Sequence, residues 1–211
     1  MTRMFQPSFI ALVMTAAILL SACASVVSVV YPLNENAAKA RAGAYRLDPD
    51  HASVLFAVSH FGFSTFRGRL GELSGSLDLD SEIPENSSVT IEIQTAGIDT
   101  GVDELDELLL ANDMFAAADH PVIVFTSTSI IRTSEDRATI EGVLTMAGVA
   151  RPVSLQGRFI GSGTNPLTRK KTVGFSATAS LLRSQFNLNN WLPFVGDEVE
   201  IMIDVEFKAI K

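Results

Sequence analysis

Cysteine is nearly absent from this chain of 211 residues, in which Cys23 is the only one. A single cysteine cannot form a disulfide within the chain. The three histidines, His51, His60 and His120, are not at the spacings typical of metal ligands, and no HExxH or CxxC motif is present. The sequence also lacks a GxSxG motif and a glycine-rich phosphate loop at the start of a helix. We therefore predict no catalytic residues, no metal site and no cofactor.

Strong positive charge is missing as well. Only 19% of the residues are charged, the formal net charge is −8, and no run of lysine and arginine occurs. Nucleic-acid binding depends on clustered basic residues that displace counterions, so no nucleic-acid partner is expected. Hydrophobic residues make up 47% of the chain, which is enough for one domain with a substantial core.

The amino terminus has the pattern of a bacterial lipoprotein signal peptide. Arg3 precedes an unbroken apolar run from Phe9 to Leu20, whose 12 residues are fewer than the roughly 20 of a membrane-spanning helix. The run ends in Leu20-Ser21-Ala22-Cys23, which matches the lipobox. We predict a signal peptide over residues 1–22 and lipidation of Cys23. The alternative is an ordinary signal peptide with a chance cysteine.

Lipidation of Cys23 would attach the chain to a membrane. A diacylglyceryl group plus an N-acyl chain exceeds the two signals needed for stable anchoring. Ala24 follows the cysteine, where aspartate would indicate inner-membrane retention, so we expect the outer membrane of a bacterial envelope, facing the periplasm. Residues 23–44 are expected to form a lipidated tether, and residues 45–211 a single folded domain.

Strand signals dominate the folded domain. Apolar and polar residues alternate in eight segments, which is the period of a half-buried strand. Each strand would have one wet face, which excludes a parallel sheet buried on both sides and favours an antiparallel barrel or a two-sheet sandwich. A short helix is predicted over Asp103–Ala111, between strands three and four and over one mouth of the barrel. Two of the strands fall within residues 53–80, and the others within 89–95, 121–131, 139–146, 151–160, 172–182 and 198–207.

The interior of such a barrel either fills with side chains or holds one ligand. The chain has 13 phenylalanines but only two tyrosines and one tryptophan. An apolar lumen about 33 Å long would suit a hydrocarbon tail, because each buried CH₂ contributes about 0.8 kcal/mol. Periodicity does not separate a filled core from a lined cavity, so both remain open here. The residues predicted to line the interior are Val54, Phe56, Val58, Phe125, Leu144, Phe159, Phe175, Ile201 and Ile203.

Five sequence blocks, in order, resemble the signature of the YceI-like family of lipocalin-like, polyisoprenoid-binding periplasmic proteins. The resemblance implies an all-β fold, an extended eight-stranded antiparallel lipocalin-like barrel. It also implies that the barrel holds an isoprenoid chain, such as a polyprenyl phosphate or a quinone tail. The blocks are Tyr45–His51, Val58–Gly68, Phe115 with His120–Thr128, Leu144–Val153, and Phe175–Ala179 with Val195–Val199.

The chain departs from the family pattern at two polar places. Leu105-Asp106 stands where the family usually carries an Arg-Asp pair. Arg183 is kept, but Gln185 and Asn187 replace the Asp and Gly that follow it. These changes affect a polar head-group site and leave the apolar lining intact.

The polar end of a bound lipid needs hydrogen-bond donors near a mouth of the barrel. His60, Arg67 and Arg183 are the candidates, although surface salt bridges would explain the two arginines equally well. The leading hypothesis is a lipid-anchored, non-catalytic carrier of an isoprenoid lipid in the envelope. The alternative is an envelope stress or scaffold protein with a side-chain-filled barrel and no lipid ligand. The oligomeric state stays open, with a homodimer as one candidate.

Overall fold

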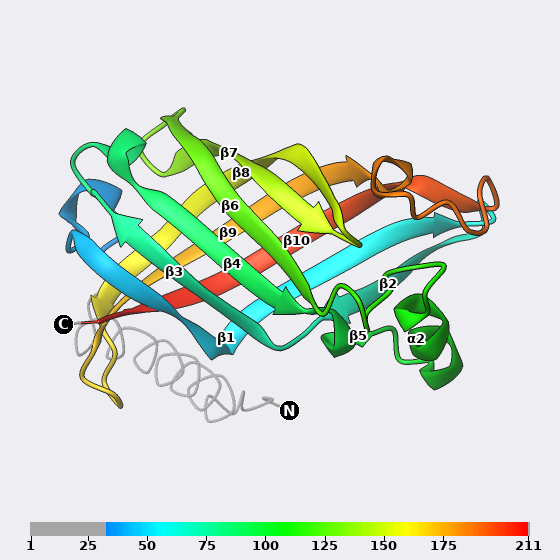
Figure 1. Ribbon diagram of the computed structural model, residues 1–211. Coiled ribbons are helices and arrows are strands. Elements are labelled where there is room, and N and C mark those ends of the chain that lie inside the picture. Colours follow the sequence, from blue (N-terminus) through cyan, green and yellow to red (C-terminus); the bar gives the residue numbers. More distant parts are fainter. Residues whose placement is uncertain (1–32, 211) are drawn as a thin grey trace, which may run out of the picture. The chain divides into compact units, whose positions relative to one another are not determined.

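A closed antiparallel β-barrel occupies most of the computed structural model, which describes residues 33–210 (Figure 1). The strands follow one another in the order β10-β9-β8-β7-β6-β4-β3-β1-β2-β5, and β10 pairs back onto β1. This last pairing closes the sheet, as an extended lipocalin-like barrel requires. The strands are β1 (Gly43–His60), β2 (Ser64–Leu70), β3 (Leu73–Leu79), β4 (Ser88–Gln94), β5 (Ile98–Asp99), β6 (Val122–Arg132), β7 (Arg137–Met146), β8 (Val149–Thr164), β9 (Lys171–Leu182) and β10 (Val195–Ala209).

Counted around the closed barrel, the ten named strands make up eight barrel strands, as the sequence predicts. The first part of β1 pairs with β3 and its last part pairs with β2, so β2 and β3 are two halves of one bent strand. The bend lies at Gly71, whose N–H donates to the Gly97 carbonyl at 2.8 Å. A Cβ atom on Gly97 would come within 2.7 Å of the Gly71 oxygen. Only glycine allows this close approach of two backbones.

A bulge divides β1 into two parts. Leu47 pairs with Phe207 and Ala52 with Val205, so five steps along β1 correspond to two along β10. The odd difference turns the strand over. Odd-numbered residues such as Tyr45 face the interior before the bulge, and even-numbered residues such as Val54 face it afterwards.

The predicted helix is present as α2 (Asp103–Leu110), between β5 and β6. Asp103, Glu104 and Asp106 lie in its first turn, where carboxylates interact favourably with the helix dipole. The Asp106 carboxylate also accepts hydrogen bonds from the Thr100 amide at 2.8 Å and the Thr100 hydroxyl at 2.6 Å. Four short 3₁₀ turns complete the fold: η1 (Ala37–Lys39), η2 (Pro84–Asn86), η3 (Thr95–Gly97) and η4 (Arg183–Phe186).

The barrel unit begins at Asn34, within the segment 23–44 assigned above to a tether. The Asn34 and Ser162 backbones exchange two hydrogen bonds of 2.8 Å, and Ala40 is buried. Residues 34–44 therefore pack as part of the barrel. The predicted signal peptide 1–22 and the predicted lipidation site Cys23 lie outside the described residues. No helix within residues 33–210 is long and apolar enough to cross a membrane.

Candidate ligand-binding cavity

Two adjoining cavities occupy the interior of the barrel. Cavity 1 has a volume of about 250 Å³ and cavity 2 about 420 Å³. Leu70, Met146, Leu181 and Ile201 line both, so the two cavities are neighbours inside the barrel. Together they match the roughly 300–1,000 Å³ of typical small-molecule sites. The barrel is therefore hollow rather than filled with side chains.

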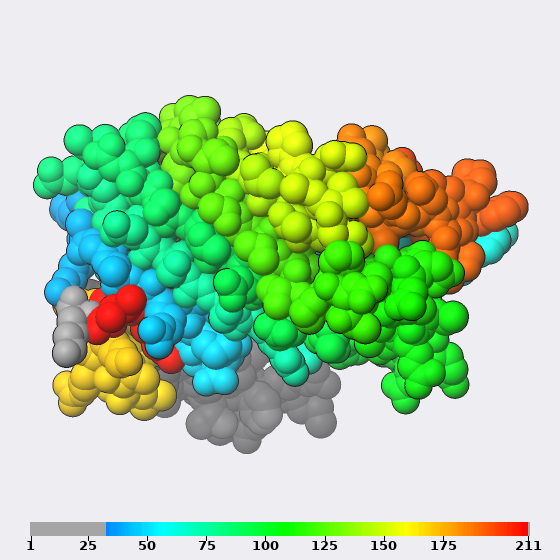
Figure 2. All heavy atoms as spheres, in the orientation of Figure 1, coloured from blue at the N-terminus to red at the C-terminus, as the bar shows by residue number. Residues whose placement is uncertain are grey.

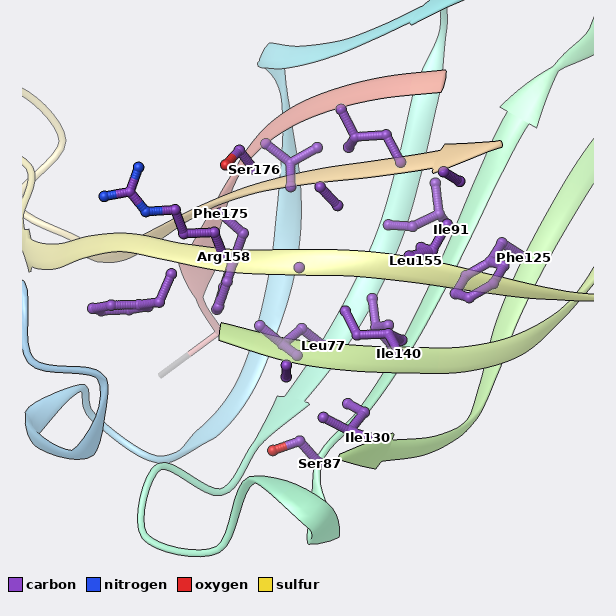
Figure 3. Close-up of a pocket in the computed structure, with 18 of the residues that line it drawn as sticks. Leu77, Ser87, Ile91, Phe125, Ile130, Ile140, Leu155, Arg158, Phe175 and Ser176 are labelled. Carbon is purple, nitrogen blue, oxygen red and sulfur yellow. The ribbon is translucent and has the colours of Figure 1, made fainter. Parts of the chain in front are cut away.

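Cavity 1 lies inside the part of the barrel that includes β3, β4 and β6 to β10. Figure 3 shows Ile91, Phe125, Ile140 and Leu155 directed into the space between these strands. Small residues at other inward positions leave this space open. They are Ala138, Gly157, Ala177 and Ala179.

Two glycines leave room for aromatic rings at the cavity wall. A Cβ atom on Gly68 would meet the Phe56 ring at 2.4 Å, and one on Gly142 would meet the Phe125 ring at 2.4 Å. Each ring therefore occupies space that another side chain would take. This arrangement lines the wall with aromatic surface and leaves room along the axis of the barrel.

Cavity 2 lies at the other end, beneath α2. Leu105 and Leu109 of α2 line it, together with Met114 and Phe115 from the segment that follows the helix. The prediction that the inserted helix covers one mouth of the barrel is confirmed. We call this end, which includes the β1–β2 turn and the loop between β9 and β10, the aromatic end.

All nine residues predicted to line the interior lie on the cavity walls, and their contact with a lipid remains a prediction. Even spacing along each strand was sufficient to identify the inward face. Val54, Phe125, Leu144, Phe159, Phe175 and Ile203 line cavity 1, Phe56 and Val58 line cavity 2, and Ile201 lines both.

Arg183 lies on the wall of cavity 2, but four of the five N–H groups of its side chain donate to backbone carbonyls. The side chain is only 7% exposed, and its guanidinium donates to four backbone carbonyls. The guanidinium therefore holds the loop after η4 in place and has one N–H left to offer a ligand head group. The donor–acceptor pairs are Nε to Gly196 (2.8 Å), Nη1 to Leu188 (2.5 Å), Nη1 to Asn190 (2.8 Å) and Nη2 to Val195 (2.9 Å).

The surroundings of Arg183 retain the turn despite the departures from the family pattern. Asn187 has φ of 63°, a left-handed conformation that glycine and asparagine adopt most readily. Hydrogen bonds from the Ser184 hydroxyl (2.7 Å) and amide (2.8 Å) lower the pKa of the Asp197 carboxyl. Burial lowers the pKa of the Arg183 guanidinium, and the charge of Asp197 opposes that shift.

The other two head-group candidates have different positions. His60 lines cavity 2 and contacts the Phe61 ring edge to face, with 4.7 Å between ring centroids. Arg67 is exposed, whereas its neighbour Phe66 lines cavity 2. Because successive side chains of a strand point to opposite faces, Arg67 lies on the outside of the barrel. Arg67 is therefore not brought to the cavity, and the structure leaves His60 as the candidate there.

Four exposed aromatic residues, which we call the aromatic rim, surround the mouth of cavity 2. Phe61 and Phe63 come from the β1–β2 turn, and Trp191 and Phe194 from the loop before β10. Phe61 and Phe194 stack with 5.5 Å between ring centroids. In Figure 2 the cyan tip of β1–β2 and the orange loop lie together at one end of the barrel.

The opposite end, which we call the charged end, is lined by charged residues from the turns around cavity 1. Arg158 Nε lies 3.0 Å from Asp136 Oδ2, and Arg137 Nε lies 4.0 Å from Asp136 Oδ1. Figure 3 shows Arg158 at one end of the group of lining side chains. Charge at this end is balanced, because three arginines face three carboxylates. The residues are Arg132, Arg137, Arg158, Asp80, Glu135 and Asp136.

A buried carboxylate stabilises the β1 bulge. Asp48 is 2% exposed, and its Oδ2 lies 2.7 Å from His51 Nδ1 and also binds Lys208 Nζ. Burial raises the pKa of Asp48, but hydrogen bonds and charge from Lys208 and His51 outweigh it, so the pKa is lowered. Among residues 33–210, Asp48, His51 and Glu206 form the one group with metal-ligand spacing. Lys208 already supplies a positive charge to this group.

The chemistry of the interior is that of an apolar container. Within residues 33–210, no buried side-chain nitrogen or oxygen lacks a hydrogen-bond partner. The walls therefore leave no unsatisfied polar group that would need a polar ligand in the middle of the barrel. An occupant of this space would be held by apolar contacts along its length.

Comparison with known proteins identifies the family. A family model described as a YceI-like domain matches residues 45–207. The chain belongs to the YceI-like family. It is 34% identical over 172 residues to a UPF0312 protein of Azotobacter vinelandii, covering 81% of this chain and 89% of the relative. It is also 34% identical over 173 residues to protein YceI of Escherichia coli O17:K52:H18, covering 81% of this chain and 90% of the relative.

Two solved structures share the fold. Burkholderia cenocepacia BcnA matches with a TM-score of 0.69 and 22% identity, over 76% of this chain and 98% of BcnA. A polyisoprenoid binding domain from Saccharophagus degradans, implicated in plant cell wall breakdown, matches with a TM-score of 0.59 and 15% identity. That match covers 80% of this chain and 99% of the domain. At these identities the likeness concerns the fold.

Sequence analysis missed the features at the two mouths. The aromatic rim residues lie in turns, where no periodicity marks a face, and two of them, Trp191 and Phe194, were not considered. Of the arginines of the charged end, Arg132 and Arg137 flank the β6–β7 turn, whereas Arg158 lies within β8 and reaches that turn only through strand pairing. One signal was present in the sequence: Phe66 belongs to the inward set of its strand, which places Arg67 outside.

Proposed function

We propose that this protein is a non-catalytic carrier that shields the tail of an isoprenoid lipid inside its barrel. The observation that carries the proposal is the pair of adjoining, mainly apolar cavities 1 and 2 inside the barrel, which share wall residues such as Leu181 and Ile201. Burial of ten CH₂ groups in such a lumen contributes about 8 kcal/mol before the costs of binding. Membership of the YceI-like family, and the polyisoprenoid binding of a domain with the same fold, support this choice of ligand.

The head group of the lipid is proposed to lie at the aromatic end. Tail-first entry keeps the polar head out of an apolar tunnel, where unpaired polar groups are costly. Two ionisable side chains line cavity 2, Arg183 and His60. Arg183 holds the loop before β10, which leaves His60 for contact with a head group. A polyprenyl phosphate and a quinone-like lipid both fit this arrangement, and they differ in how strongly they depend on His60.

The cellular setting is proposed from the amino-terminal pattern. Acylation of Cys23 would hold the protein at a membrane of the bacterial envelope, with the outer membrane and its periplasmic face expected from Ala24. Mass measurement of the mature chain from producing cells tests this part separately from ligand binding. Processing before Cys23 with no added acyl mass would contradict it.

Ligand binding can be tested by filling the lumen. Ala179 lines cavity 1, and the neighbouring Thr178 is exposed on the same strand. We expect Ala179→Phe to reduce the isoprenoid that co-purifies with the protein by about tenfold or more, since overpacking by a large side chain costs about 1–3 kcal/mol. Thr178→Phe should retain the lipid. Mass spectrometry of organic extracts, together with circular dichroism to check folding, measures both.

The outcomes separate the carrier from the scaffold alternative. Repeated absence of any isoprenoid from the unaltered protein, both as purified and after incubation with prenyl lipids in detergent, would contradict the carrier proposal. A scaffold protein would also show the same thermal stability with and without prenyl lipid. The carrier should gain stability when lipid is added, because a ligand that binds only the folded state stabilises it.

A further inference from the structure

The aromatic rim displays apolar side chains to solvent at the mouth of cavity 2. Phe63 is 91% exposed, Phe194 61%, Phe61 51% and Trp191 43%. These residues come from two segments that are joined by a hydrogen bond of 2.7 Å from the Phe61 amide to the Phe194 carbonyl. Exposed apolar clusters of this kind usually mark a surface that contacts something other than water.

The tips that carry the rim contain no formally charged side chain apart from His60, if it is protonated. Residues 60–66 and 187–196 include no aspartate, glutamate, lysine or arginine, although 19% of the whole chain is charged. Charged groups would oppose entry into a membrane interface. The acidic residues at this end lie beside the tips, on α2 and at Asp113, whose Oδ2 accepts a hydrogen bond from Asn190 Nδ2 at 3.1 Å.

The backbone holds the rim in an outward-facing conformation. Phe61 has φ of 51° and Trp191 has φ of 64°, which are unfavourable values for bulky side chains. Arg183 fixes the loop that carries Trp191 and Phe194 through its four carbonyl contacts. Such conformations persist only where the surrounding structure enforces them, so the exposure of these rings is a built feature.

The rim is also continuous with the lumen. Phe61, Trp191 and Phe194 line cavity 2 as well as reaching solvent. Tryptophan and phenylalanine are the side chains that proteins place at and just below the surface of a lipid bilayer. We propose that the aromatic rim docks on a lipid bilayer and that the isoprenoid tail passes directly between the bilayer and cavity 2. The second part of this proposal rests on the carrier function proposed above.

A bilayer fits this surface better than a folded protein does. The rim consists of two loop tips, and three of its rings also line cavity 2, whose wall is mainly apolar. A lipid tail that left a bilayer through the rim would pass from the acyl chains to the aromatic and aliphatic side chains of cavity 2. The cost of exposing the tail is thereby avoided.

Trp191 provides a direct test, because it is the only tryptophan in the chain. The full chain is mixed with phosphatidylethanolamine–phosphatidylglycerol vesicles whose acyl chains are brominated near the glycerol end. We expect the emission of Trp191 to shift to shorter wavelength and to be quenched. This readout reports the depth of the rim itself, whatever the amino terminus contributes to vesicle binding.

Two variants make the test specific. Phe63→Ser alters the rim at a residue that is not on the cavity wall, so quenching by a brominated lipid inside the lumen would survive it. In the docked state the Phe63 ring would be buried in the bilayer, and the variant lacks that ring. We therefore expect the variant to reduce the vesicle-dependent quenching by about tenfold. Leu167→Ser, at a residue that is also 91% exposed but lies in the β8–β9 turn, should leave the quenching unchanged.

The outcomes distinguish this proposal from the carrier function. Binding of a prenyl lipid in detergent, with Trp191 emission unchanged by vesicles, overturns bilayer docking and leaves the carrier intact. Quenching that depends on Phe63 in a protein that binds no prenyl lipid supports docking and overturns the carrier. A concentration-dependent blue shift without vesicles assigns the rim to a second copy of this chain and overturns docking on a bilayer.

Discussion

The two halves of the barrel each contain one buried charged residue, and these two residues work differently. Within residues 33–210 only Asp48 and Arg183 are charged side chains that are buried. Asp48, in the half that leads to the charged end, holds a strand bulge through Lys208 and His51. Arg183, at the aromatic end, holds a loop through four backbone carbonyls.

The difference teaches which parts of the barrel respond to pH. A carboxylate can be neutralised by acid, whereas an arginine keeps its charge at every pH at which proteins fold. The mouth that we assign to lipid entry is therefore built on a contact that does not titrate. The bulge that turns β1 over depends on the contacts of the Asp48 carboxylate, which can be protonated.

The largest effect is expected from removing the arginine of the aromatic end. Arg183→Met leaves four buried or half-buried carbonyls without their donor, and we expect the free energy of unfolding to fall by about 3–5 kcal/mol. Urea denaturation followed by circular dichroism measures the change. Arg67→Met is the matched control. Its side chain is on the outer face, and a change within about 0.5 kcal/mol is expected. Equal effects of the two would show that the carbonyl contacts contribute nothing.

The carboxylate of the other half should contribute less, because Lys208 is partly exposed and can be solvated when its partner is lost. We expect Asp48→Asn to lower the free energy of unfolding by about 2–3 kcal/mol at pH 7. Asp204→Asn, at an exposed position of β10, is the control and should change it by less than about 0.5 kcal/mol. An Asp48 variant as stable as the unaltered protein would mean that the bulge does not need the ion pair.

A pH titration sharpens the comparison further. The pKa of Asp48 in the folded protein is lowered below its unfolded value of about 3.9. Its contribution to stability is therefore fully present above the unfolded pKa and is lost as the pH falls through the folded pKa. Between pH 5 and pH 2 the unaltered protein should lose more stability than Asp48→Asn does. Parallel curves for the two proteins would contradict this assignment.

The smallest effect is expected at the charged end. Because the arginines there are balanced by carboxylates, Arg158→Ala should change the affinity for a polyprenyl phosphate by less than about twofold. His60→Leu, at the aromatic end, should weaken the same binding by about tenfold if the phosphate accepts a hydrogen bond from the imidazole. Fluorescence titration in detergent measures both. The reverse order of effects would place the head group at the charged end.

Much of the barrel follows from local sequence patterns. Period-two alternation located all eight strands of the barrel, and the leucines and acidic residues of Asp103–Leu110 located the helix. The same alternation identified the inward face, which is why Phe56, Phe125 and the other predicted residues lie on the cavity walls. These features depend on neighbours in sequence, so the sequence is sufficient to find them.

The polar candidates could not be resolved in this way. Whether an arginine faces a ligand or a ring of carbonyls depends on the path of a distant loop, and Arg183 contacts carbonyls up to Gly196. The empty space itself depends on how small residues such as Ala177 and Ala179 come together across strands. The aromatic rim arises from two turns that meet only in the closed barrel.

The bulge in β1 has a consequence for how this fold tolerates insertions and deletions. Because the strand turns over at Asp48–His51, the chain on one side of that point uses opposite parity from the chain on the other. Deleting a single residue there would exchange the inward and outward positions of the β1 residues that follow. Val54, Phe56 and Val58 would then face water. The length of this short segment therefore sets which residues of β1 face the cavities along the rest of the strand.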